Sequence, residues 1–161
     1  MKILSAKAKI LLGMIFTLMI CLMFAGCSNS DTTSDSRGFT DFKHIEEEYL
    51  ATIDSLDWPD GVELPKKLEN EDTGASFQVG YGETRASNLW EYSWMKEWLD
   101  TYNTNPERAE KALEELEKAF DMPYMGKDRC DDATRNYLRE NIDKAKLGDP
   151  SGFRECIDVN Y

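Results

Sequence analysis

The stretch LWEYSWMKEWL, Leu89 to Leu99, constrains the fold most, because it places Trp90, Trp94 and Trp98 at four-residue spacing. On a helix the three rings fall within an arc of about 80°. The other sides of that helix are also apolar, with Leu89, Tyr92, Met95 and Leu99. Because a helix that is apolar nearly all round is usually enclosed by neighbours, the pattern predicts a central helix over residues 84–102. The rings are interpreted first as core, with an aromatic platform that contacts a ligand as the alternative.

Four further stretches carry helical signals. Residues 40–56 combine an apolar stripe with an acidic face, and residues 131–147 show similar periodicity before a glycine. Two more helices should start where proline follows a capping residue, one over residues 106–122 after Asn105 and a short one after Asp149.

The segment between the first two predicted helices is punctuated too often for a helix, by Pro59, Gly61, Pro65, Gly74, Gly80 and Gly82. Its alternating apolar residues predict one short strand, formed by Phe77, Val79 and Tyr81, with Val62 and Leu64 as partners. The predicted fold class is mainly α: a small helical bundle of four to five helices with a long irregular connection, in one domain over residues 39–161.

The amino terminus has the layout of an export signal. Lys2, Lys7 and Lys9 precede residues 10–25, an apolar run without a charged residue, which leads into Gly26 and Cys27. A basic leader, a short apolar segment and small residues before a cleavage site are typical of a signal peptide, and the run is short for a stable membrane span.

The four residues Phe24-Ala25-Gly26-Cys27 resemble the lipobox of bacterial lipoproteins. The resemblance implies that the thiol of Cys27 receives a diacylglyceryl group and that residues 1–26 are removed as a signal peptide. The protein would then be held on the extracytoplasmic face of the cell membrane by the lipid on Cys27, since two acyl chains anchor a protein stably. An uncleaved membrane helix that ends beside Cys27 is the alternative.

Residues 27–38 should act as a flexible tether, because nine of the eleven residues after Cys27 are Ser, Thr, Asn or Asp. The leader holds three of the 19 basic residues and none of the 31 acidic ones, so the chain from Cys27 has 16 basic residues and a net charge of −15. Such a charge disfavours nucleic acid as a partner, because its phosphates require clustered Lys and Arg.

Two cysteines, Cys130 and Cys156, remain in the predicted extracytoplasmic domain. A disulfide between them would close a loop of about 27 residues and stabilise the fold by roughly 3.5 kcal/mol on the chain-entropy estimate. Two free thiols or a redox pair are the alternatives, and the absence of CxxC spacing disfavours the redox pair. The disulfide is therefore the favoured prediction for an exported protein.

Two short motifs do not match a cofactor site. The segment ENEDTG has the alternating oxygen ligands of a calcium loop, but Gly80 stands where that loop needs a glutamate. The segment GYGETR lacks the third glycine of a dinucleotide-binding loop and is interpreted as a turn. The lone histidine, His44, is interpreted as a surface residue. The sequence thus predicts no cofactor, no metal site and no catalytic residue.

The tryptophan pattern, Trp90, Trp94 and Trp98-Leu99, and the later segment GDPSG at residues 148–152 are similar to small uncharacterised exported proteins of Gram-positive actinobacteria. This resemblance implies a helical domain and carries no activity.

The sequence favours a lipid-anchored, non-catalytic module that binds an unknown exported protein or envelope component. No nucleophile motif, zinc-protease motif or phosphate-binding loop is present. The alternative is an envelope enzyme that acts on glycan through paired carboxylates.

Overall fold

Five α-helices and two very short strands form the part of the chain that the computed structural model describes, residues 38–161. In chain order these are β1 Phe39–Thr40, α2 Phe42–Ser55, β2 Phe77–Gln78, α3 Tyr81–Thr101, α4 Pro106–Glu117, α5 Asp132–Lys146 and α6 Ser151–Asn160. Two 3-10 turns, η1 Lys118–Asp121 and η2 Pro123–Met125, join α4 to the segment before α5. The predicted mainly helical fold is confirmed, whereas the signal peptide, Cys27 and residues 28–37 of the tether lie outside the described residues.

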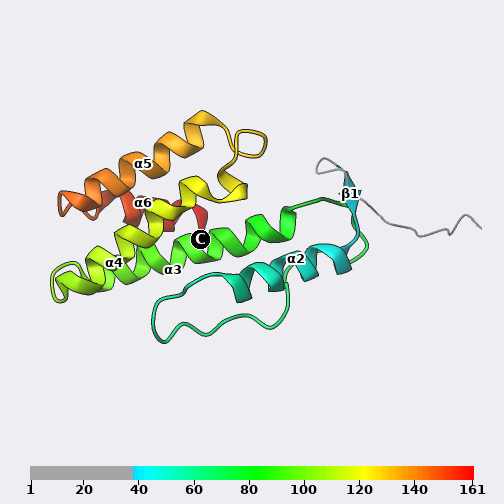
Figure 1. Ribbon diagram of the computed structural model, residues 1–161, viewed down its shortest axis with the longest axis horizontal. Coiled ribbons are helices and arrows are strands. Elements are labelled where there is room, and N and C mark those ends of the chain that lie inside the picture. The colour runs from blue at the N-terminus through cyan, green and yellow to red at the C-terminus, as the bar shows by residue number, and fades with distance from the viewer. Residues whose placement is uncertain (1–37) are drawn as a thin grey trace, which may run out of the picture. The chain divides into compact units, whose positions relative to one another are not determined.

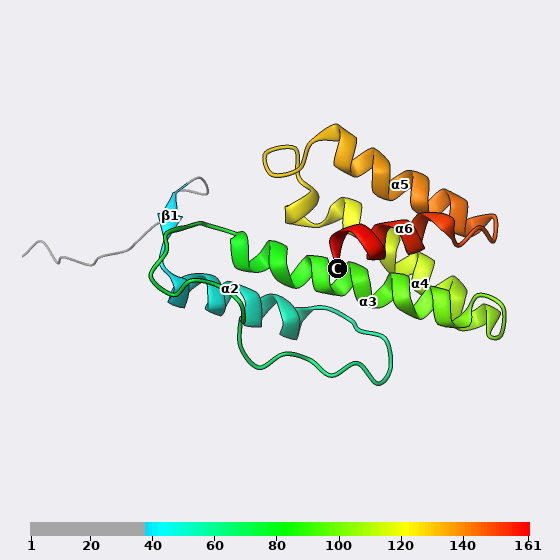
Figure 2. The ribbon, with the colours of Figure 1, turned by 180° about the vertical axis from the view of Figure 1, so that it is seen from behind.

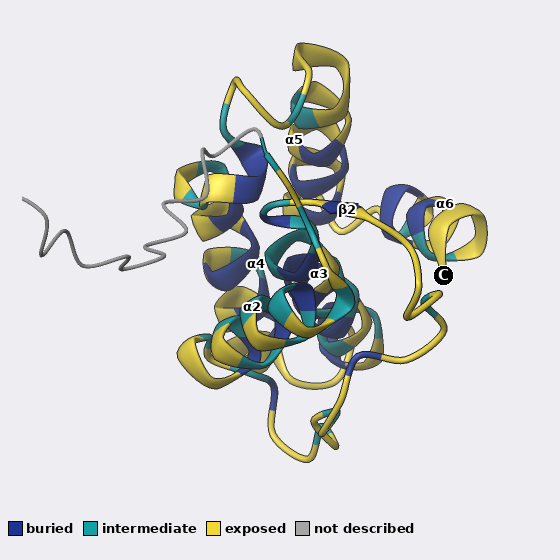
Figure 3. Cartoon of the chain, turned by 90° about the vertical axis from the view of Figure 1, so that its right-hand side faces the viewer, coloured by how far each residue is buried: buried dark blue, intermediate teal, exposed yellow. Residues whose placement is uncertain are grey.

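Helix α3 runs through the middle of the domain, with α2 on one side and α4 and α5 on the other (Figure 1). Figure 2 shows α6 lying against the face of α3 that is turned away in Figure 1. Buried residues gather on the sides of the helices that face one another (Figure 3). Buried residues cover more than half of the circumference of α3, but Arg85 and Lys96 lie exposed on the remaining side and Tyr92 is only partly buried there, so this central helix is not enclosed all round as predicted.

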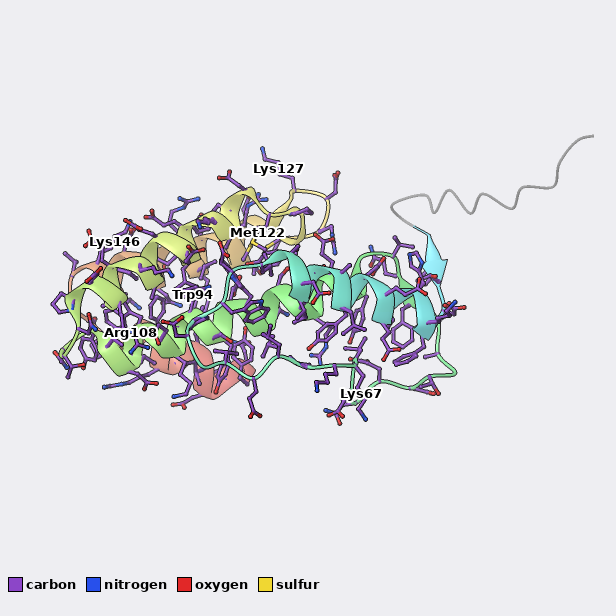
Figure 4. The ribbon with its side chains drawn as sticks, turned by 60° about the horizontal axis from the view of Figure 1, so that its bottom comes forward. Lys67, Trp94, Arg108, Met122, Lys127 and Lys146 are labelled. Atoms are coloured by element: carbon purple, nitrogen blue, oxygen red, sulfur yellow. The ribbon has the colours of Figure 1, made fainter. Side chains whose placement is uncertain are left out.

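The structure places all three tryptophans of α3 in the core. Trp90, Trp94 and Trp98 are each at most 2% exposed. The indole N–H groups of Trp90 and Trp94 both donate to the carbonyl of Asp57, at 2.8 and 3.1 Å, and so fix the start of the connection against α3. Figure 4 shows Trp94 among the helices, while Lys127 extends outward. No exposed tryptophan face is therefore left on α3 for a ligand platform.

Helices α2 and α3 approach each other through their backbones. A Cβ atom at Gly82 would lie 1.9 Å from the carbonyl oxygen of Ile45, so only glycine fits. The Glu48 carboxylate accepts from the backbone N–H groups of Gly80, at 2.8 Å, and Gly82, at 3.2 Å. These N–H groups at the start of α3 have no partner within their own helix, and Glu48 satisfies them.

The predicted strand forms with a different partner. Phe77 and Gln78 pair in antiparallel fashion with Thr40 and Phe39, not with Val62 and Leu64. The close packing of α2 along α3 brings the segment before α2 beside the segment before α3. Gly80, with a φ of 86°, then turns the chain into α3. Tyr81 is therefore helical, and GYGETR opens a helix where a turn was expected.

Most predicted helix ends are confirmed, but α6 begins at Ser151 with Pro150 as its N-cap residue, so Asp149 is not the predicted cap of this helix. Asn105 and Asp131 accept from the N–H groups of Arg108, at 3.2 Å, and Thr134, at 2.7 Å, as helix caps do. The helix predicted for residues 106–122 instead tightens into 3-10 geometry after Glu117. None of the helices within residues 38–161 has both the length and the apolar character to cross a membrane.

Candidate functional site

A cavity of about 850 Å³ lies between α3, η2, α5 and α6, and we call it the Glu91 cavity. Its size is in the range of pockets that hold small molecules. Thr84, Asn88 and Glu91 line it from α3, where they occur at i, i+4 and i+7 and therefore share one helix face. The rest of the lining includes three tyrosines, two cysteines and two arginines, of which Arg85 also comes from α3: Tyr124, Tyr137, Tyr161, Cys130, Cys156, Arg85 and Arg129.

Glu91 is the most unusual side chain of the cavity, because it is a carboxylic acid that is only 7% exposed. The hydroxyl of Tyr124, from η2, donates a hydrogen bond to it. Burial raises the pKa of Glu91 to about 7, and the Tyr124 hydrogen bond opposes this rise. The group is therefore divided between its acid and carboxylate forms near neutral pH.

Helix α6 and the residue after it form the wall opposite α3. Asn160 donates from its amide to the carbonyl of Cys156, at 2.9 Å, and Tyr161 donates from its hydroxyl to the carbonyl of Asn88, at 2.9 Å. The second bond ties the end of α6 to α3 across the cavity edge. Tyr161 and Tyr137 are 53% and 38% exposed, which places these two rings at the mouth.

The two arginines of the lining already have carboxylate partners. Arg85 forms an ion pair with Glu71 at 3.2 Å. Arg129 pairs with Glu83 and also donates to the carbonyl of Gly80 and the hydroxyl of Thr84. Within residues 38–161, no basic side chain forms an ion pair with Glu91. The charge left unbalanced in this cavity is therefore negative.

Cys130 and Cys156, the predicted disulfide partners, are both free thiols and both line the Glu91 cavity. Burial raises the pKa of both thiols, and the charge of Glu91 contributes to the rise for each. They are therefore protonated and weakly nucleophilic near neutral pH. The disulfide stays a prediction, one that would join two walls of the same cavity.

A second hollow, of about 450 Å³, lies at the other end of α3, between α4 and the end of α5. Trp98 lines it together with Tyr102, Leu113 and three glutamates of α4, Glu110, Glu114 and Glu117. The ring of Trp98 also stacks on Tyr102 and contacts Phe153 edge to face. This tryptophan is thus held by neighbours from two sides and adds only an edge to the hollow.

His44 lies on the surface, as expected, with its imidazole Nε2 3.3 Å from Glu48. Asp131 caps α5, and residues 38–161 contain no group of side chains with the arrangement of a metal site. Sequence reasoning missed Glu91. The signal was present, because Glu91 is a carboxylate between Trp90 and Trp94, in a stretch that the sequence predicts to be core.

Comparison with known proteins gives no relative: no protein-family model, no curated protein and no solved structure matches the chain.

Proposed function

We propose that the protein is a lipid-anchored, extracytoplasmic binding module that holds a small molecule of the cell envelope in the Glu91 cavity. The observation that carries this proposal is the cavity itself, about 850 Å³ in volume, with a buried carboxylic acid in its wall. Pockets that bind small molecules combine apolar surface with a few placed polar groups, and this lining has that composition. The lipobox at Phe24–Cys27 supports the anchor.

The lining favours binding over the alternative of a glycan-cleaving enzyme. Such an enzyme needs two carboxyl groups that act on one bond. The acidic residues of the lining are Glu91 and Asp131. Asp131 accepts the N–H of Thr134 as the cap of α5, and this hydrogen bond lowers its pKa. A carboxylate committed to a cap leaves Glu91 without a catalytic partner.

The binding role is tested by filling the cavity. Ala133 is an exposed residue of α5 that lines the Glu91 cavity, so Ala133→Trp should occupy its mouth without disturbing the core. We expect fragments that bind the full chain in detergent, detected by ligand-observed NMR, to lose binding in this variant. Ala51→Trp places the same side chain on the exposed side of α2 and should bind them like the wild type. Equal binding by both variants would contradict the proposal.

The anchor is tested separately. We expect Cys27→Ala to abolish incorporation of labelled lipid and to leave the precursor uncut, since the modified thiol marks the cleavage site in bacterial lipoproteins. Cys21→Ala, a change of the other cysteine in the leader, should be labelled and processed normally. Normal processing of the Cys27→Ala protein would refute the lipid anchor. It would not bear on the proposal that the cavity binds a small molecule.

A further inference from the structure

Glu91 is a buried acid with fewer partners than its ionised form requires. The hydroxyl of Tyr124 is the single donor that reaches it from residues 38–161, and no basic side chain neutralises it. An ionised carboxylate out of water is unfavourable unless a cation or several donors accompany it. Glu91 nevertheless lines a cavity and not solid core, so a bound molecule can supply what the protein lacks.

The surroundings favour a cation as that molecule. The positive charges of Arg85 and Arg129 are already balanced by Glu71 and Glu83, so they leave no site for an anionic ligand. The domain as a whole is strongly acidic, and a negative field concentrates cations near such a mouth.

The aromatic lining points in the same direction. Tyr124, Tyr137 and Tyr161 contribute rings, and Met125 and Leu138 add apolar surface. Aromatic rings attract organic cations through their electron-rich faces, while apolar walls accommodate a hydrocarbon body. Since Tyr124 donates to one oxygen of Glu91, the other oxygen is available to accept from a ligand N–H.

We propose that the Glu91 cavity binds a small organic cation, a protonated amine with an apolar or aromatic body, whose ammonium group donates to the Glu91 carboxylate. This inference rests on the proposed function, since it names the class of ligand for the same cavity. A quaternary ammonium fits less well because it has no N–H to donate. An anion fits poorly, since it would meet Glu91 without a free arginine.

The test compares three probes of nearly equal size that differ in charge: 2-phenylethylamine, 2-phenylethanol and phenylacetate. Binding to the full chain in detergent is measured by calorimetry and ligand-observed NMR at pH 8, where the Glu91 carboxylate prevails. We expect the amine to bind at least about tenfold more tightly than the alcohol, and phenylacetate to bind least.

Three variants locate the effect. Glu91→Gln keeps the size and an acceptor for Tyr124 but removes the charge, so the preference for the amine over the alcohol should disappear. Tyr124→Phe removes the hydrogen bond that favours the charged form of Glu91, so the preference for the amine should weaken without disappearing. Glu140→Gln makes the same change on the exposed face of α5 and should behave like the wild type. Circular dichroism confirms folding, and if Glu91→Gln fails to fold, the pH dependence of probe binding to the wild type decides: the preference for the amine over the alcohol should weaken from pH 8 to pH 6, as Glu91 takes up its proton, and a preference that does not change overturns the proposal.

The outcomes separate this inference from the proposed function. If the alcohol or phenylacetate binds as tightly as the amine, or the Glu91→Gln variant keeps the amine preference, the cation proposal is overturned while a binding cavity remains. If none of the probes binds and Ala133→Trp changes no fragment binding, both proposals are overturned.

Discussion

Two carboxylates on different sides of α3 differ in how completely the fold satisfies them. Glu48, from α2, accepts from two backbone N–H groups at the start of α3 and lies next to His44. Glu91, within α3, has one hydroxyl donor and borders a cavity. The first carboxylate closes a helix end, whereas the second is left short of partners.

The packing around the two carboxylates differs in the same way. On the α2 side, Gly82 allows the backbones of two helices to meet, and nothing fits between them. On the α5 and α6 side, the helices stand apart and enclose about 850 Å³. A fold that satisfies the Glu48 carboxylate on one side and leaves the Glu91 carboxylate short of partners on the other has a structural side and a binding side. The following variants test that division.

The largest effect is expected from Gly82→Ala. The added methyl group would meet the backbone oxygen of Ile45, so α2 and α3 must move apart. We expect the free energy of unfolding to fall by about 4 kcal/mol, above the usual range for an overpacked core because backbone is the obstacle. Denaturant titration followed by tryptophan fluorescence measures it.

Gly74→Ala is the matched control. Its Cβ would lie in ordinary contact with Asp72, 3.4 Å from a side-chain oxygen, in an exposed part of the connection. We expect a change below about 1 kcal/mol. If the two glycine variants lose equal stability, the α2 side is not the tightly packed side.

The second effect concerns Glu91 and depends on pH. Because the pKa is raised from 4.5 to about 7, the native state keeps a proton that the unfolded state has lost between these values. The free energy of unfolding therefore falls as pH rises, and the whole decrease, about 3 kcal/mol, is present above pH 7. Glu91→Gln removes this penalty, so its stability relative to the wild type should increase by that amount from pH 4.5 to pH 8.

The other titratable groups near Glu91 do not change in this window. Tyr124, Tyr161, Cys130 and Cys156 ordinarily ionise above pH 8, and burial raises the pKa of Tyr124 and of both cysteines further. Glu140→Gln, on the surface, should give a difference from the wild type that hardly varies with pH. If the stability difference between Glu91→Gln and the wild type is equally independent of pH, the Glu91 carboxylate is as well satisfied by its partners as that of Glu48.

The third effect is the loss of the cap on α3. We expect Glu48→Ala to lower the free energy of unfolding by about 2 kcal/mol, because the N–H groups of Gly80 and Gly82 lose a charged acceptor. Glu47→Ala removes a neighbouring carboxylate that is exposed and paired only with Lys43, and should cost about 0.5 kcal/mol or less. Equal losses in thermal or denaturant unfolding would argue against a structural role for Glu48.

The sequence predicted the features that depend on local rules. The helices over residues 40–56 and 131–147 follow from periodicity, and the cap Asn105 follows from a side chain three residues away from its partner. The strand pairing of Phe39 with Gln78 joins distant segments, and its partner was predicted wrongly. Likewise, the partner of Glu91 is Tyr124, 33 residues away, so its burial could be assigned only once the helices were placed.

The smallest effect concerns the accessibility of the tryptophans. Trp58 packs both against the core around the three tryptophans of α3 and against the smaller core around Ile45, Tyr49 and Ile53 of α2. Trp58 is partly exposed and donates to the carbonyl of Ile53 at 2.9 Å, whereas the three tryptophans of α3 are at most 2% exposed. Iodide, which does not enter packed cores, should therefore quench a small part of the native fluorescence, and Trp58→Phe should abolish most of that part. If substantial quenching persists in the Trp58→Phe protein, a ring of α3 is accessible, and a ligand contact through Trp98 beside the second hollow becomes the better explanation.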